Sequence, residues 1–247
     1  MGFDLILQGP LNETSLKNID NVAGKFENII LSYWSENDIV PGGFYESQNV
    51  IETSRPTPDR EKTSGVIKDS TFYFSVTSTL EGLRRCKSQY VVKTRSDEKF
   101  TDFSLLKELF LKDDERFVFG NIFAKSWAKS AYHIGDHIFV AKTEHLLKGY
   151  EFLYEAYTTG KHLFEHSWLM QGYPSYQTAE SILAKSFLHA KGIDLSTWDS
   201  KETLLQNFEV IDINLLGDYI ARWNHSNVTY TPKNNRFNAR IKHIGDF

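Results

Sequence analysis

Charged side chains of both signs follow directly after a short apolar run in the middle of the chain. The run is residues 90–94, and the charged residues at and beyond its end are Lys93, Arg95, Asp97 and Glu98. Open α/β sheets bind ligands at the carboxyl ends of their strands, and Arg and Lys are the side chains that hold phosphate. The pattern indicates a site for a phosphate-bearing ligand, with or without a divalent cation. The alternative is a solvated turn in which Arg95 and Asp97 form a structural ion pair.

Two other predicted strands end in residues that suit the same ligand. The first strand ends in Gln8 and Gly9, and a glycine lets a ligand approach the backbone closely. The third strand ends just before Arg55. Because parallel strands place their carboxyl ends along one edge, Arg55, Lys93 and Arg95 are expected to converge on one anion.

Two further carboxylates are candidates for acid–base chemistry. Asp136 directly precedes the predicted strand 137–141, where aspartate is unfavourable on propensity, so it is either a turn residue or a contact to substrate or metal. Glu180 lies in the first turn of the predicted helix 179–191. There it either complements the helix dipole or serves as a general base that faces the sheet edge.

Several function classes are excluded by what the sequence lacks. It contains no G-x-G-x-x-G dinucleotide fingerprint, no phosphate-binding P-loop and no G-x-S-x-G nucleophile motif. The net charge of −4 provides no basic excess for a nucleic acid, so no nucleic-acid partner is expected. Cys86 is the single cysteine, which excludes an internal disulfide and fits a reducing compartment. No apolar run approaches the length of a membrane span and no signal peptide is recognisable, so we expect a cytoplasmic protein with at most peripheral membrane contact.

The elements that must position these residues alternate between strand and helix in the first half of the chain. We expect strands at 3–7, 28–34, 49–53 and 90–94 and helices at 14–26 and 69–87. In the second half we expect helices at 102–111, from 143 and at 179–191, strands at 117–123 and 137–141, a loop-rich segment at 161–177, and an irregular remainder with a helical stretch at 214–223. This order predicts an α/β fold, a single Rossmann-like domain with a mostly parallel mixed sheet flanked by helices.

The order of these motifs resembles that of the WavE-type lipopolysaccharide-synthesis proteins. The motifs that carry the resemblance are LILQGP at 5–10, IILSYW at 29–34, KTRSD at 93–97, GDHIF at 135–139 and AE at 179–180. Each motif is short, and only their order is specific; together they extend over residues 5–188. Those proteins are similar to GT-A glycosyltransferases, which use nucleotide-sugar donors.

The resemblance implies a single GT-A-like domain over 1–247, with a nucleotide-sugar-binding half at 1–100 and an acceptor-binding half with a C-terminal extension at 101–247. It implies that Gln8, Gly9 and Asn12 approach the nucleotide. Asp97 falls where such enzymes keep an Asp-x-Asp motif that holds a divalent cation, Mn²⁺ or Mg²⁺, and the diphosphate. This chain has no aspartate two residues to either side of Asp97, so Arg95 or Lys93 could instead neutralise the leaving group.

The same resemblance places Glu180 where inverting relatives keep the catalytic base, and Asp136 is the second choice. The expected activity is therefore inverting transfer of a sugar to an oligosaccharide or glycolipid acceptor in surface-polysaccharide, lipopolysaccharide or glycoprotein-glycan synthesis. The aromatic segment 154–176 is a candidate platform for the acceptor. Two alternatives use the same site: a nucleotidyltransferase or sugar-nucleotide hydrolase, and a non-catalytic carbohydrate-binding protein.

Overall fold

The fold is built around one mixed, mostly parallel β-sheet, as the sequence predicts. The computed structural model describes residues 2–9, 13–34, 49–53, 70–121, 134–159, 179–195, 201–217 and 219–220. Its strands follow the order β3-β2-β1-β4-β7-β6-β8, and β7 alone runs antiparallel to its neighbours. They are β1 (Phe3–Gln8), β2 (Asn28–Trp34), β3 (Asn49–Thr53), β4 (Tyr90–Arg95), β6 (Phe117–Gly120), β7 (Ile138–Lys142) and β8 (Phe208–Ile211). A two-stranded ribbon joins β5 (Lys99–Phe100) to β9 (Tyr219–Ile220).

The strand order creates a switch point beside β1. The chain proceeds outward from β1 through β2 to β3 and then returns to β4 on the other side of β1. In sheets of this kind the ligand crevice lies outside the carboxyl ends of the strands where the order reverses. Because β7 is antiparallel and pairs Ile138 with Thr94, its first residues lie at that same edge.

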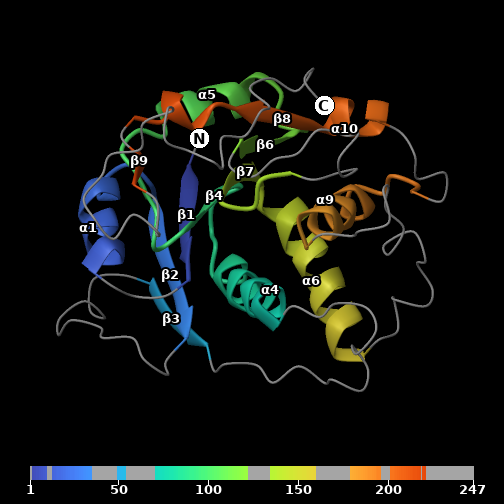
Figure 1. Cartoon of the computed structure of the whole chain (residues 1–247), viewed down its shortest axis with the longest axis horizontal. Helices are drawn as coiled ribbons and strands as arrows, with labels where there is room; N and C mark the ends of the chain where they lie inside the picture. Colours follow the sequence, from blue (N-terminus) through green and yellow to red (C-terminus); the bar gives the residue numbers. More distant parts are fainter. Residues whose placement is uncertain are drawn as a thin grey trace.

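Helices cover both faces of the sheet (Figure 1). One face carries α4 (Ser70–Leu83), α6 (Thr143–Thr159) and α9 (Ala179–Ala190), and the other carries α1 (Glu13–Val22) and α5 (Ser104–Lys112). The short α10 (Lys201–Asn207) precedes β8, and the 3₁₀ turn η1 (Ile213–Leu215) follows it. No helix within the described ranges is long and apolar enough to cross a bilayer.

The two covered faces explain why the central strands have apolar residues at successive positions. Ile6 and Val91 pack into the core beneath α4, α6 and α9, whereas Leu5 and Val92 pack into the core beneath α1 and α5. A strand buried on one face would alternate apolar and polar residues, but a strand buried on both faces is apolar throughout. This sandwiching holds the carboxyl ends of β1 and β4 in fixed positions at the switch point.

The strands predicted in the first half agree with the structure to within one residue, both predicted helices there end four residues too late, and the other main errors lie near the C-terminus. The stretch predicted as irregular contains α10 and β8, and β8 extends the sheet by pairing with β6. The helix predicted at 214–223 is wrong, because the described part of this stretch forms η1 and β9 instead. Helix α1 ends at Val22 and not at residue 26, since Gly24 adopts φ 74° and ends the helical path.

Candidate functional site

The ends of β1 and β4 are joined by backbone contacts at the switch point. Gly9 has φ 132°, a conformation that favours glycine, and its N–H donates to the Ser32 carbonyl at 3.1 Å. The N–H of Ser96 donates to the Gln8 carbonyl at 2.9 Å. A Cβ on Gly9 would lie 3.0 Å from Ser96 Oγ, so the two segments are close to van der Waals contact. The Gln8 side chain is buried and accepts a hydrogen bond from Ser75 on α4 at 3.4 Å.

Asn18 on α1 fixes the turn that follows β4. Its buried amide Nδ2 donates to the Ser96 carbonyl at 3.0 Å and also to the Glu98 carbonyl. These bonds span 78 and 80 residues of sequence, and they satisfy two carbonyls of the turn. The turn that carries Asp97 is therefore held by the helix on one face of the sheet, and the sequence analysis missed this residue.

Arg95 and Asp97 form a bidentate ion pair at the end of β4. Arg95 Nε lies 3.0 Å from Asp97 Oδ1, and Nη2 lies 3.1 Å from Oδ2. The carboxylate is 3% exposed and the guanidinium side chain 15% exposed. Burial tends to lower the pKa of Arg95, but the charge and hydrogen bonds of Asp97 raise it overall. The structural ion pair weighed as the alternative reading is thus present, and both Asp97 oxygens face the guanidinium.

Glu98, His137 and Asp136 form a second charged group at the same edge. His137 Nδ1 lies 2.5 Å from Glu98 Oε1, and His137 Nε2 lies 3.5 Å from Asp136 Oδ1. Burial tends to lower the pKa of His137, but the two carboxylates, Glu98 first, raise it overall. Burial likewise tends to raise the pKa of Asp136, and the positive charges of His137, Lys93 and Arg95 lower it overall. The imidazole therefore links Glu98, in the turn after β4, to Asp136, two residues before β7.

Lys93 is buried beneath this group. Its Nζ donates to the Asp136 carbonyl at 2.6 Å and lies 5.2 Å from the centre of the Phe139 ring. Burial lowers the pKa of Lys93 to about 8, although Asp136 tends to raise it. The Lys93 ammonium would have to leave this carbonyl to contact a ligand directly, so in this arrangement it acts on the site through its charge.

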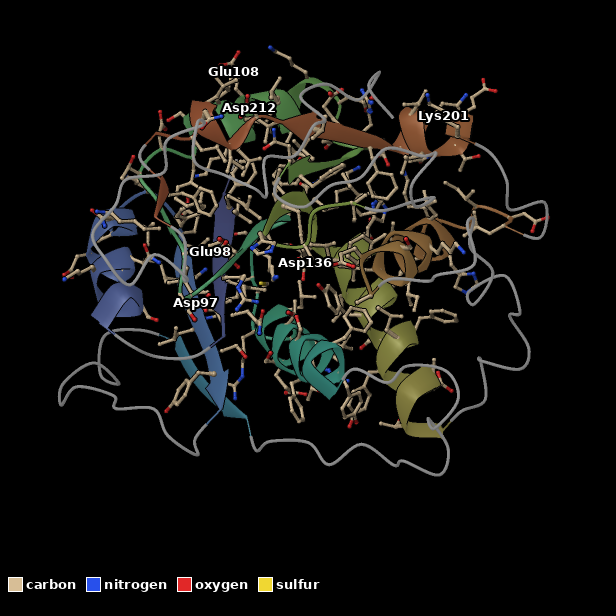
Figure 2. The ribbon with its side chains drawn as sticks, viewed as in Figure 1. Asp97, Glu98, Glu108, Asp136, Lys201 and Asp212 are labelled. Carbon is tan, nitrogen blue, oxygen red and sulfur yellow. The ribbon has the colours of Figure 1, made fainter. Side chains whose placement is uncertain are left out.

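Of the residues predicted for the site, those that the structure describes at this edge of the sheet lie close together. Figure 2 shows Asp97, Glu98 and Asp136 in the interior, whereas Glu108 and Asp212 lie at the periphery. Gln8 and Gly9 lie at the end of the adjacent strand β1, paired in register with β4. The predictions for Asn12 and Arg55 fall outside the described residues, as does most of the aromatic segment 154–176.

The parallel strands begin at one edge of the sheet, its amino edge. Glu180 lies at the end of α9 that is farther from this edge. The opposite end of α9 is tied to that edge, because Lys191 Nζ donates to the carbonyl of Glu115, just before β6, and to Asn207 Oδ1. With a rise of about 1.5 Å per residue, Glu180 lies about 16 Å along the axis from Lys191. The side chain is half-buried in the first turn. Its role as a catalytic base stays a prediction.

The residues around Asp97 do not fit a divalent cation. The site offers Asp97 as its expected ligand, and the guanidinium already occupies both oxygens of that carboxylate. Within the described part of the chain, no group of His, Cys, Asp and Glu side chains has the arrangement of a metal site. The positions two residues to either side of Asp97 carry Arg95 and Lys99, which are cations and cannot supply a second carboxylate ligand.

Comparison with known proteins assigns the chain to no family. No protein-family model matches the sequence, and no curated protein matches it significantly. Solved structures that resemble it include HddC from Yersinia pseudotuberculosis, at 9% identity and TM-score 0.38 over 60% of this chain and 79% of HddC. They also include the galactosyltransferase LgtC, solved with donor and acceptor sugar analogues, at 9% identity and TM-score 0.44 over 74% of this chain and 69% of LgtC.

A third is glucosyl-3-phosphoglycerate synthase from Mycobacterium tuberculosis, solved with Mn²⁺, UDP and phosphoglyceric acid. It matches at 13% identity and TM-score 0.38 over 79% of this chain and 80% of its own. Glycosyltransferases are thus among the structural neighbours, but likenesses this distant assign no residue, substrate or cation to this chain. The functional argument therefore depends on the site itself.

The contribution of His137 to stability is expected to depend on pH. Its folded-state pKa is raised, so its contribution is complete below the unfolded-state value of about 6.5 and is lost as pH rises through the folded value. Unfolding in urea at a series of pH values should show a difference between the native chain and His137→Gln that shrinks as pH rises. Lys93 titrates in both proteins, so its opposite contribution to the pH dependence of stability cancels in the difference between them.

His145 on α6 is the matched control for this measurement. Burial lowers its pKa, so the difference between the native chain and His145→Gln should grow as pH rises toward about 6.5. If the stability difference between the native chain and His137→Gln stays constant across the pH range, the His137 imidazole does not titrate in its place beside Glu98 and Asp136.

Proposed function

We propose that this protein is a glycosyltransferase that takes a sugar from a nucleotide-sugar donor. The observation that carries the proposal is the convergence of ionised and backbone groups at the switch point of the sheet. Gly9 follows β1, Arg95 ends β4 and Asp97 follows it, and Asp136 precedes β7, all at one edge. Phosphate ligands bind at this place in open α/β sheets, where backbone and cationic donors can meet them.

In the proposed reaction the donor diphosphate binds beside the carboxyl ends of β1 and β4, at the switch point of the sheet. The acceptor hydroxyl attacks the anomeric carbon, and its proton passes to Glu180, with Asp136 as the second candidate. The bond between the anomeric carbon and the diphosphate oxygen breaks, and the electron pair leaves with the diphosphate. Attack opposite the leaving group inverts the anomeric configuration. A positioned base of this kind contributes about 10²–10⁴-fold to the rate.

The negative charge that builds on the departing diphosphate is stabilised by the positive groups at the end of β4. Arg95 is the partly exposed one of these, and Lys93 lies buried behind it. Fixed charges in a site from which water is largely excluded stabilise a transition state without reorganisation during the reaction. The Asp97 carboxylate holds Arg95 in place, and the Asp136 carbonyl holds Lys93.

The finer assignment is also a proposal. The ordered motifs resemble those of WavE-type proteins, and they support an acceptor that is an oligosaccharide or a glycolipid of a surface polysaccharide or lipopolysaccharide. They also support action in the cytoplasm, where nucleotide sugars are the donors, with residues 1–100 serving the donor and residues 101–247 the acceptor.

A donor screen tests the proposal directly. The protein is incubated with a panel of nucleotide sugars, and thermal shift and release of free nucleoside diphosphate are both measured. A ligand at about 100 times its dissociation constant should stabilise the fold by about 2.7 kcal/mol. We expect one class of donor to stabilise the protein and to release nucleoside diphosphate, faster when an acceptor is present.

Three other results would contradict the proposal, the last two from parallel incubations with a nucleoside triphosphate plus a sugar phosphate and with free sugars. Release of nucleoside monophosphate with sugar phosphate would indicate a sugar-nucleotide hydrolase. Formation of a nucleotide sugar from a nucleoside triphosphate and a sugar phosphate would indicate a nucleotidyltransferase. Binding of free sugar without any turnover of donor would indicate a carbohydrate-binding protein.

A further inference from the structure

We infer that Arg95 binds the donor diphosphate directly and takes the place that a divalent cation would have at this edge of the sheet. The inference rests on the proposed function and deepens it. It assigns Asp97 to the positioning of a guanidinium, and it states that the donor binds without a metal ion.

The ion pair leaves one edge of the guanidinium available. A guanidinium has N–H donors in a fixed planar fork, and it can offer two different edges to two different anions. Asp97 takes the edge formed by Nε and Nη2. No residue within the described ranges accepts a hydrogen bond from Nη1. The edge formed by Nη1 and Nη2 has the geometry for a second bidentate contact, and phosphate oxygens match it.

The position of Arg95 is that of a ligand-binding residue. It is the last residue of β4, and its backbone pairs with Gln8 at the end of β1. Its side chain is 15% exposed, whereas Asp97, Glu98 and Lys93 are almost fully buried. Arg95 is therefore the positive group of the site that a ligand in the crevice can reach without rearrangement.

A divalent cation at the same place would face electrostatic repulsion. Like charges repel, and the repulsion grows with the charge of the ion, so a divalent ion bound to Asp97 would be repelled by the adjacent guanidinium. Arg95 lies 3.0 Å from the Asp97 oxygen that the metal would need. The nearest additional carboxylate, Glu98, directs Oε1 to His137, and its buried Oε2 has no hydrogen-bond partner among the described residues.

The surrounding groups hold Arg95 in the orientation that the inference requires. Its backbone N–H donates to the His137 carbonyl at 3.2 Å, and Asn18 fixes the turn that carries Asp97. Charge-assisted bidentate contacts are the strong class of hydrogen bond in proteins. A guanidinium that is already oriented loses little conformational freedom when a diphosphate binds, so it can supply affinity that a cation would otherwise supply.

The test is a binding titration in the presence and absence of metal. The protein is freed of metal and titrated by calorimetry with UDP, GDP, ADP, CDP and dTDP, once with EDTA and once with Mn²⁺. We expect one of these nucleoside diphosphates to bind in EDTA with an affinity within about threefold of that in Mn²⁺. Arg95→Gln should weaken this binding about 30-fold or more, and Mn²⁺ should not restore it.

Two further variants keep the result interpretable. Arg95→Gln combined with Asp97→Asn removes the buried charge that the single variant leaves unpaired, and it should show the same loss of affinity with better stability. Arg84→Gln is the control, because Arg84 is an exposed arginine on α4 that pairs with Glu81 and should leave the affinity unchanged. Arg95→Lys keeps the charge without the fork and should lie between the native chain and Arg95→Gln.

The outcomes separate this inference from the proposed function. Binding that requires Mn²⁺ would overturn the role given to Arg95 and leave the glycosyltransferase proposal intact. Unchanged affinity in both the single and the double Arg95 variants would also overturn it. Absence of binding under both conditions would overturn the inference and the proposed function together.

Discussion

Asp97→Ala is expected to lower sugar transfer by about 10²–10³-fold, the loss typical when a group that stabilises transition-state charge is disturbed. The carboxylate holds Arg95 through two hydrogen bonds at 3.0 and 3.1 Å. Without them Arg95 Nε keeps a longer ion pair with Glu98 Oε1, at 3.8 Å, which holds the guanidinium less firmly in its orientation. Because the pair is largely buried, loss of one partner should also lower the free energy of unfolding. We expect a loss of about 3 kcal/mol or less, at the low end for a buried pair because Arg95 is partly exposed.

Steady-state kinetics with the donor identified by the screen, together with urea unfolding, measures both effects. Glu108→Ala on α5 is the matched control, because Glu108 is an exposed carboxylate that pairs with Lys112 at 3.3 Å and lies at the periphery in Figure 2. Native transfer rates in folded Asp97→Ala protein would remove Asp97 from the mechanism, whatever the stability result.

Glu180→Gln is expected to lower kcat by about 10²–10⁴-fold with little change in the KM for donor, because a general base acts in the chemical step. Asp136→Asn should have a smaller effect on kcat. The positive charges of His137, Lys93 and Arg95 lower the pKa of Asp136 overall against the effect of burial, and a carboxylate with a lowered pKa is a weak proton acceptor.

The pH–rate profiles of the two variants separate these roles. Loss of the acidic limb of kcat in Glu180→Gln alone would support Glu180 as the base, whereas the same loss in Asp136→Asn would transfer the role to Asp136. Glu144→Gln is a matched control, since Glu144 is an exposed acidic residue in the first turn of α6. If all three variants keep native kcat, the base is another group.

The local elements of this protein could be predicted well where apolar runs are strong. The strands β2 and β3 match the predicted ranges, and the predicted placement of Lys93, Arg95 and Asp97 at a strand end is confirmed. These predictions succeed because burial on both faces demands continuous apolar residues, and the change to charged residues marks the carboxyl end of the strand. The four-residue strand β8 was missed because a strand so short has too little pattern to distinguish it from a loop.

The pairing of charges at the site could not be predicted, because it depends on which elements the fold places side by side. Asn18 reaches the turn after β4 from 78 residues away, and His137 meets Glu98 from 39 residues away. Neither contact has a signature in local spacing. His137 directly follows a residue that was singled out, Asp136, but a lone histidine beside a strand does not show which carboxylate it will contact.

The amino-acid sequence by itself determined the class of fold and the edge of the sheet where the charged residues gather, because both follow from local burial and strand direction. Only the tertiary structure decided what those residues do to one another. It turned both oxygens of Asp97 toward Arg95, buried Lys93 against a carbonyl and placed His137 between two carboxylates. The reason is that ionised groups removed from water must find partners of opposite charge nearby, and tertiary packing alone decides which partners are near.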